Sequence, residues 1–272
     1  MIANARMYAL NDAVAGAWKQ LFEWIGRHAG VPLDVISHAA PAPLARLWGR
    51  GDLGCAVMCG YPWATWDDAT TLRPVPLAAP IPSPPRFGAM PRYWSDIVVR
   101  ANSPASSERD LAGARFAFTV EDSQSGYQAP RAFFSDHALA AGGRFFGSAI
   151  GPVVTPRRVV DCLLSGAADA GPLDAWWHEM LRRHEPSIAA RLRIIARTAT
   201  TPMPFLVASG TVAQDVKRRL IDAFDAVATA QELADVRATL LLLGFARVDP
   251  AGYSELAERA REVDRLGYTR LQ

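Results

Sequence analysis

The sequence predicts an α/β protein of two lobes, each a mainly parallel sheet flanked by helices. Strand-like and helix-like patterns alternate along most of the chain, and two stretches, residues 73–91 and 198–204, interrupt the alternation. A chain of 272 residues is long enough for two domains of ordinary size. We therefore expect lobe 1 in residues 1–88 and 203–272, and lobe 2 in residues 89–202.

The first part of the chain alternates helices and short strands. Asn11 is a typical helix cap, and apolar residues follow it at helical spacing until Gly30 ends the pattern. Strands are expected at 33–37 and 55–58, with a short helix at 44–48 between them. Such alternation is typical of parallel strands joined by crossover helices.

The stretch at 73–91 holds seven prolines and little charge. Because proline lacks a backbone N–H and has a fixed φ, the stretch is predicted to be an extended crossover and not a helix or a central strand. After it the alternation restarts. We expect strands at 95–101, 115–119, 169–172 and 205–208, and helices at 126–141, 157–164, 173–183, 212–228, 231–243 and 250–266.

Composition and charge exclude several classes of protein. A net charge of +2 is too small to predict binding to nucleic acid or to an anionic membrane surface, and no stretch of about 18 residues is apolar enough for a transmembrane helix. Cys55 and Cys59 share one face of a predicted strand, but no histidine has metal-ligand spacing, so no metal is expected. His137, His178 and His184 lie in charge-rich helical segments and are expected at the surface. No catalytic motif is found, and no catalytic residue is assigned.

The segment between the strand at 115–119 and the helix after it has the composition of an anion-binding loop. Ser123 and Ser125 supply hydroxyl donors, and Gly126 permits close approach of the backbone. The N–H groups at the start of a helix have no helical partners and favour a negative charge. The alternative, that one of the serines only caps the helix, is equally consistent with these residues.

Two motifs in this region resemble a known family. Residues 110–118, Asp-Leu-Ala-Gly-Ala-Arg-Phe-Ala-Phe, and residues 122–127, Asp-Ser-Gln-Ser-Gly-Tyr, resemble the lead-in strand and ligand loop of the phosphate, phosphite and phosphonate (PhnD-type) substrate-binding proteins of ABC transporters. Residues 166–174 are similar to a Gly-x-x-Asp-Ala-x-x-x-Asp motif of the same family. The sequence departs from the family pattern at Gln124, which replaces a threonine, and at residues 154–156, which replace Gly-Ser-His.

The resemblance implies a type II periplasmic-binding fold with a ligand cleft between the lobes and no cofactor. It further implies that the serine loop holds an anionic head group, that tyrosines after the first and third strands contact the ligand, and that a carboxylate in lobe 2 recognises an amine. Nearby aromatic side chains either stack on the ligand or only pack the lobe interior. The ligand-binding residues expected on these grounds are Ser123, Gln124, Ser125, Gly126, Tyr127, Tyr8, Tyr61, Asp174, Tyr93 and Trp177.

The function that the resemblance implies is the capture of a small organic anion by lobe closure, for uptake through an ABC-transporter permease. The ligand would be similar to a phosphonate or phosphate ester, with an amine or aromatic part. The family is periplasmic, but residues 1–10 show no basic stretch followed by an apolar core, so no secretory signal is expected there. A cytoplasmic location therefore stays open, as do two alternatives on the same fold: an enzyme similar to those of thiamine-precursor or menaquinone biosynthesis, and a ligand sensor.

Overall fold

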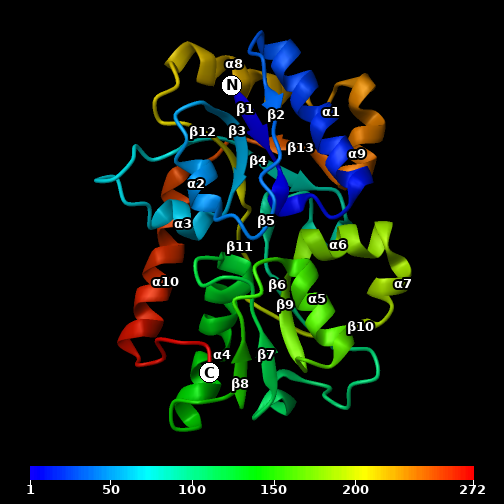
Figure 1. Cartoon of the computed structure of the whole chain (residues 1–272), viewed down its shortest axis with the longest axis vertical. Helices are drawn as coiled ribbons and strands as arrows, with labels where there is room; N and C mark the ends of the chain where they lie inside the picture. Colours follow the sequence, from blue (N-terminus) through cyan, green and yellow to red (C-terminus); the bar gives the residue numbers. More distant parts are fainter. The chain divides into compact units, whose positions relative to one another are not determined.

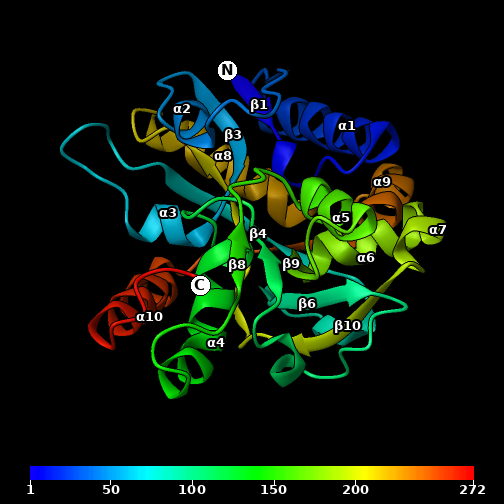
Figure 2. The same cartoon turned by 60° about the horizontal axis from the view of Figure 1, so that its bottom comes forward.

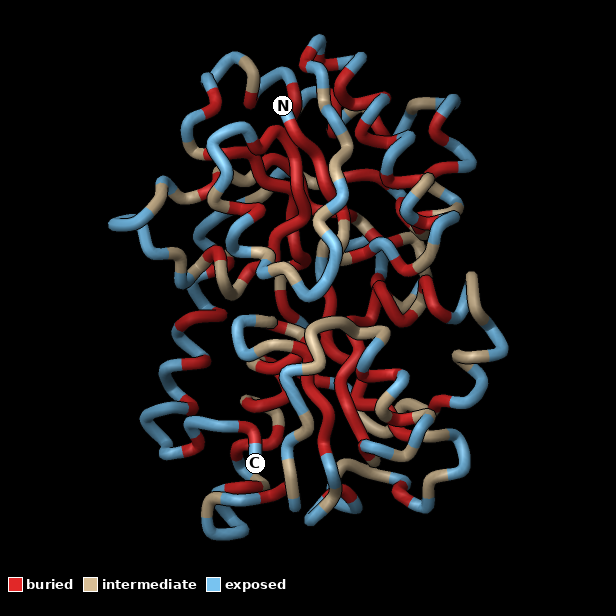
Figure 3. Tube along the Cα trace, viewed as in Figure 1, coloured by how far each residue is buried: buried red, intermediate tan, exposed pale blue.

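The computed structural model describes residues 1–272, which form two compact units. Unit 1 comprises Met1–Arg92 and Pro202–Tyr253, and unit 2 comprises Tyr93–Thr201 and Ser254–Gln272 (Figure 1). Each unit has its own sheet, and buried residues concentrate in the strands of both sheets (Figure 3). None of the helices is long and apolar enough to cross a membrane.

The sheet of unit 1 has six strands. They are β1 (Ile2–Asn4), β2 (Asp34–Val35), β3 (Leu53–Met58), β4 (Val75–Pro82), β12 (Phe205–Ala208) and β13 (Leu242–Ala246), in the spatial order β13-β4-β12-β3-β1-β2. β1 is parallel to β2 and β3, β12 is antiparallel to β3 and β4, and β13 is antiparallel to β4. The first four strands in the chain therefore run in one direction, and their carboxyl ends meet at one edge.

Helix α1 (Asp12–Ala29) shows how the local sequence sets the elements of unit 1. The Asn11 side chain caps the helix by accepting from the Val14 N–H at 3.1 Å, and Gly30 ends it in the left-handed conformation at φ 59°. The helix packs against α8 (Gln214–Ala226) and α9 (Ala234–Leu240). The other helical segments of unit 1 are η1 (Arg6–Tyr8), α2 (Leu44–Trp48), α3 (Gly60–Ala64), η2 (Pro85–Phe87), η5 (Gln231–Leu233) and η6 (Pro250–Tyr253).

Strand β4 lies inside the proline-rich stretch and is an interior strand of the sheet, so the predicted crossover is wrong for these residues. Pro80 and Pro82 are two positions apart in the part of β4 that pairs with β13, so their missing N–H groups lie on the same side of the strand. The ladders to β12 and β13 also carry register irregularities, and proline inside a sheet is typically found at such places.

The helix expected at 231–243 is shorter than predicted and is followed by a strand. α9 ends at Leu240, and Leu241 takes a left-handed conformation with φ 51° that ends the helix. The next residues form β13, which pairs with β4 at the edge of the sheet. Pairing with a distant strand overrides the local helical pattern here.

The sheet of unit 2 has five strands. They are β6 (Ser95–Arg100), β7 (Arg115–Ala117), β8 (Ser148–Ile150), β9 (Ala170–Asp174) and β10 (Leu192–Arg197), in the spatial order β10-β6-β9-β7-β8. β7 is parallel to β8 and β9, and β6 is antiparallel to β9 and β10, so β6 alone runs against the others. A two-stranded sheet of β5 (Arg92–Tyr93) and β11 (Thr201–Pro202) lies where the sequence changes unit.

Helices cover both faces of the unit 2 sheet (Figure 2). On one face, Phe116 of β7 packs against Phe134 of α4 (Ala129–Ala140), with ring centroids 5.6 Å apart. On the other face, Gly171 of β9 leaves room for Val159 of α5 (Pro156–Ser165), because a Cβ at this glycine would lie 2.6 Å from a Val159 methyl carbon. The other helical segments of unit 2 are η3 (Glu108–Leu111), the π-helical turn η4 (Gln124–Gln128), α6 (Ala175–His184), α7 (Pro186–Ala189) and α10 (Ser254–Arg265).

Helix α10 belongs to unit 2, whereas the sequence-based division places all of residues 203–272 in lobe 1. Val263, Tyr268 and Leu271 join the apolar core around β7, and α10 lies beside α4 (Figures 1 and 2). The expectation fails for residues 254–272 because an amphipathic pattern shows which face a helix buries but not the sheet against which it packs.

Candidate anion-binding site

The carboxyl edge of the unit 2 sheet brings the serine loop next to two strand ends. β9 ends at Asp174, which pairs with Ser95, the first residue of β6. The Ser95 hydroxyl donates to the Ser125 carbonyl oxygen at 2.7 Å, and the Ser95 N–H donates to Thr198 Oγ1 at 2.9 Å. Ligands of open α/β sheets bind at such an edge. The sequence analysis missed Ser95 and Thr198 because their contact joins residues 103 positions apart.

The serine loop comprises residues 121–128, and its second half is the π-helical turn η4, which leads into α4. Ser123 Oγ accepts from the Gly126 N–H at 3.0 Å, and the Ser123 carbonyl oxygen accepts from the N–H groups of Tyr127 and Gln128. The N–H and hydroxyl of half-exposed Ser125 make no hydrogen bond within the protein. Ser123 thus caps the turn, and Ser125 offers donors that an anion can use.

Close packing leaves no room for a side chain larger than that of glycine at position 126. A Cβ at Gly126 would overlap Thr119 Oγ1 and would lie 2.9 Å from Ser123 Oγ. Thr119 is buried, and its hydroxyl oxygen has no hydrogen-bond partner in the protein. Any larger residue at position 126 would therefore push the loop away from the strand end.

The charges at the start of the loop do not favour an anion. The pKa of Asp122 is raised above its ordinary value, first because its carboxylate loses hydration and also because Glu121 carries a like charge. The first residues of the loop therefore supply no positive charge, and the donors that the loop itself offers an anion are N–H and O–H groups.

Asp174 and Trp177 lie at the start of α6, on the same edge of the sheet. Asp174 Oδ1 accepts from the N–H groups of Trp176 and Trp177 at 2.9 and 3.0 Å, so the carboxylate caps α6. Both tryptophans are buried, and the Arg157 guanidinium lies 5.8 Å from the centre of the Trp177 ring. Recognition of an amine by Asp174, and of a ligand by Trp177, stay predictions.

Tyr127 points into the core of unit 2, although it directly follows Gly126. It is 5% exposed, its ring centroid lies 5.0 Å from that of Phe118, and its hydroxyl accepts from the Leu271 N–H at 3.1 Å. These contacts indicate that Tyr127 anchors the serine loop to the core of unit 2. Tyr93 is also buried, and Gln124 is buried within the loop.

Tyr8 and Tyr61 lie in unit 1, after two neighbouring parallel strands. Tyr8 ends η1, which follows β1, and Tyr61 lies in α3, which follows β3. Because β1 and β3 are parallel neighbours, both tyrosines lie at the carboxyl edge of the unit 1 sheet. Tyr8 is buried and Tyr61 is half-buried. Their contact with a ligand stays a prediction.

A buried pair that the sequence analysis missed lies near the loop edge of unit 2. The expectation that His178 lies at the surface is wrong, because it is 1% exposed and its Nδ1 lies 2.8 Å from Oδ2 of fully buried Asp96. Asp96 Oδ1 accepts from Trp94 Nε1 at 3.0 Å, and Arg197 Nε lies 3.7 Å from it. Asp96, the second residue of β6, therefore supplies the buried hydrogen-bond acceptor that allows His178 to lie in the interior and not at the surface.

The cysteines show no features of a metal site. Cys55 and Cys59 are both buried, and burial raises the pKa of the Cys55 thiol. No group of three or more His, Cys, Asp or Glu side chains is arranged to hold a metal ion. Cys55 lies in the fully buried strand β3 and packs there as a small apolar residue.

One family model matches almost the whole chain. It describes the periplasmic substrate-binding protein of ABC transporters for phosphonate, and it matches residues 8–253. Proteins of this family bind substrates and are not enzymes, and the family is periplasmic. No curated protein matches the sequence.

Solved structures share the fold at low sequence identity. A binding protein component of an ABC phosphonate transporter from Pseudomonas aeruginosa has a TM-score of 0.79 at 16% identity, over 98% of this chain and 87% of that one. PhnD1 from Prochlorococcus marinus in complex with methylphosphonate has a TM-score of 0.78 at 18% identity, over 97% and 98% of the two chains. XAC2383 from Xanthomonas citri bound to ATP has a TM-score of 0.67 at 17% identity, over 98% of each chain. These likenesses show the type II periplasmic-binding fold that the family resemblance implies.

Proposed function

Because the chain belongs to the phosphonate-binding periplasmic substrate-binding proteins of ABC transporters, we propose that it captures a small organic oxyanion, a phosphonate or a phosphate ester, and delivers it to an ABC-transporter permease. Closure of two lobes on the ligand, with lobe 2 supplying the serine loop, is part of this proposal. Action in the periplasm follows the family and is proposed with it.

The observation that carries the proposal is the pair of donors on Ser125, its N–H and its hydroxyl, which have no partner within the protein. The Ser123 hydroxyl adds a third donor, since its oxygen already accepts from Gly126 and its proton can point outward. Three directed donors around a glycine suit a compact head group with several oxygens, such as a tetrahedral phosphorus oxyanion.

The ligands of two structural neighbours support the same chemical class. The Prochlorococcus protein binds methylphosphonate and the Xanthomonas protein binds ATP, and both ligands carry phosphorus oxyanions. We propose that Ser123, Ser125 and Gly126 meet such a head group in this chain. The contacts of Tyr8, Tyr61 and Asp174 with the remainder of the ligand belong to the same proposal.

Ligand titrations test the anion loop. Methylphosphonate, inorganic phosphate, ATP, a sulfonate and a carboxylate are titrated against the protein by calorimetry and by thermal stability. We expect a phosphorus oxyanion to bind best, and Ser125→Asp to weaken it by roughly a hundredfold, because the loss of a donor is combined with charge repulsion. Ser125→Ala should weaken it by roughly tenfold.

Ser165→Asp is the matched control, since it makes the same charge change at an exposed serine of α5. It should leave the affinity unchanged. If Ser125→Asp bound every stabilising ligand as tightly as the wild type, the anion-loop assignment would be wrong. Mass spectrometry of the ligand recovered after binding should show it unaltered, whereas a chemically changed ligand would favour an enzyme.

A further inference from the structure

The segment Ser254–Gln272 contacts the helix that follows the serine loop, and it lies outside residues 8–253, to which the family model extends. Within unit 2, α10 packs against α4 (Figure 2). Tyr268 and Leu271, which follow α10, belong to the same apolar core as Tyr127 of the loop. This segment is therefore in a position to hold the loop through side chains of η4 and α4.

Arg131 of α4 is the centre of these contacts. It is 3% exposed, and its guanidinium donates to Asp264 Oδ1 at 2.6 Å, to the Tyr268 carbonyl oxygen at 2.8 Å and to the Ala260 carbonyl oxygen at 3.2 Å. All three acceptors belong to the segment Ser254–Gln272. A planar guanidinium with several fixed donors has one orientation when its acceptors are rigid, so the segment fixes the position of Arg131.

Gln128 connects Arg131 to the start of the serine loop by hydrogen bonds. Its Oε1 accepts from Arg131 Nη2 at 2.9 Å and from Nε at 3.2 Å, and its Nε2 donates to the Glu121 carbonyl oxygen at 2.7 Å. Because Arg131 occupies the amide oxygen, the amide nitrogen must point toward Glu121. The two ends of the loop, Glu121 and Gln128, are thus tied together across the serines.

Tyr127 is a second tether between the loop and the same segment. Its hydroxyl accepts from the Leu271 N–H at 3.1 Å, and Tyr268, also in the segment, is fully buried. Neither Gln128 nor Tyr127 needs to touch a ligand to act in this way. Tyr127 lies on the side of the loop that faces the core, and Gln128 is partly buried beside Arg131.

We propose that Arg131, Gln128 and Tyr127 are positioning residues, through which the segment Ser254–Gln272 holds the serine loop in the geometry that binds the anion. The inference rests on the proposed function for its consequence, since a loosened loop loses affinity only if it binds an anion. The physical reason is preorganisation: a loop that is already ordered loses less conformational entropy when the ligand arrives.

The contacts that connect the segment Ser254–Gln272 to the serine loop through Arg131, Gln128 and Tyr127 are called the relay here. Hydrogen exchange of the backbone amides tests the relay without any ligand. Gln128→Met keeps the length of the side chain and removes both hydrogen bonds. We expect the amides of Ser123, Gly126 and Tyr127 to exchange roughly tenfold faster in this variant, with the strands β7 and β9 unchanged. Gln128→Glu keeps the acceptor for Arg131 but loses the donor to Glu121, so it should exchange at the same faster rate.

Arg193→Gln is the control, because Arg193 also binds two backbone carbonyl oxygens of unit 2, those of Ser103 and Ala105, on a different part of the sheet. It should leave exchange in the loop unaltered. The relay is refuted if Gln128→Met does not change exchange in the loop, or if Arg193→Gln changes it equally.

Affinity for methylphosphonate and for inorganic phosphate tests the functional consequence. Gln128→Met should weaken the binding of whichever probe the wild type binds by roughly threefold to tenfold. Unchanged affinity together with faster exchange would overturn the positioning role. If the wild type bound neither probe nor any other anion of the titration panel, the proposed function would fail, and the exchange measurement would still decide whether the relay orders the loop.

Discussion

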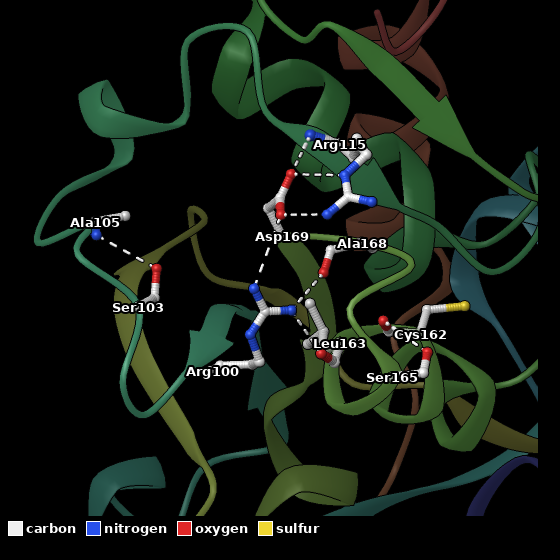
Figure 4. Close-up of polar contacts among 9 residues, drawn as sticks. All are labelled: Arg100, Ser103, Ala105, Arg115, Cys162, Leu163, Ser165, Ala168 and Asp169. Atoms are coloured by element: carbon white, nitrogen blue, oxygen red, sulfur yellow. Dashed lines mark hydrogen bonds and ion pairs between the residues drawn. The ribbon is translucent and has the colours of Figure 1, made fainter.

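The two edges of the unit 2 sheet carry polar side chains of different kinds. At the loop edge lie Ser95, the serine loop and Asp174. At the opposite edge, called here the distal edge, the strand ends carry Arg100, Arg115 and Asp169 (Figure 4), and a cavity of about 510 Å³ opens beside them. The charged side chains alone would favour the distal edge as a binding site.

The hydrogen bonds of the distal edge argue against a binding site there. Arg115 donates to both oxygens of Asp169 at 2.7 and 3.0 Å, and Arg100 donates to the carbonyl oxygens of Leu163 and Ala168 (Figure 4). The charged groups there bind one another and the backbone, whereas Ser125 at the loop edge keeps two donors without partners. Uncommitted donors, and not the number of charges, distinguish a candidate binding edge from a structural one.

Removal of one aspartate from each edge gives the largest contrast in stability. Asp96→Ala leaves His178 Nδ1 and Trp94 Nε1 without their buried acceptor, and we expect it to lower the free energy of unfolding by about 2–4 kcal/mol. Asp169→Ala breaks a partly exposed pair and should cost about 1 kcal/mol or less. Urea denaturation of both variants measures the difference, and equal losses would contradict the distinction between the edges.

Gly126→Ala tests the close packing of the loop edge. The added methyl group would overlap Thr119 Oγ1, so we expect a loss of about 1–3 kcal/mol in stability together with a loss of anion binding. Gly16→Ala in α1 is the control, because nothing lies within 4 Å of the added Cβ, and it should stabilise the protein by about 0.5–1 kcal/mol. Anion binding by Gly126→Ala at wild-type affinity would show that the loop tolerates displacement.

Arg115→Gln tests whether the distal edge takes part in binding. The pKa of Asp169 is lowered first by its hydrogen bond from Arg115, so the substitution should raise this pKa toward its ordinary value of 3.8. Carbon-detected NMR titration of the carboxyl group measures the change. Stability should fall by about 1 kcal/mol or less, and anion affinity should not change. A drop in anion affinity would assign a binding role to the distal edge.

The smallest effect is expected from Asp110, the third residue of η3 at the distal edge, whose side chain accepts from the N–H of the N-cap residue Ser107. N–H groups and hydroxyls of Ser106 and Ser107 lower its pKa from 3.8 to about 2. The stabilising contribution is therefore present above pH 4 and is lost as the pH falls toward 2. Asp110→Asn should flatten the acid side of the curve of melting temperature against pH, while a curve identical to that of the wild type would remove Asp110 from the acid response.

The sequence predicts elements that depend on neighbouring residues better than features that depend on contacts between distant parts of the chain. α1, α2 and the strand before the serine loop follow from caps, apolar periodicity and glycine positions, all of which act within a few residues. The sequence does not predict β4 as an interior strand, because its prolines disfavour one. Whether a missing N–H group costs a hydrogen bond depends on the neighbouring strands, which the local sequence does not specify. The inward turn of His178 depends on Asp96, 82 residues earlier.

By itself, the sequence determined that a serine- and glycine-containing loop joins a strand to a helix, because capping and close backbone approach are local properties of those residue types. Only the tertiary structure decided which donors remain available and what holds the loop. Ser95 reaches Ser125 across the sheet edge, and Arg131 binds Asp264 across 133 residues. Such contacts depend on how strands pair and helices dock, and no pattern within a short window of sequence specifies them.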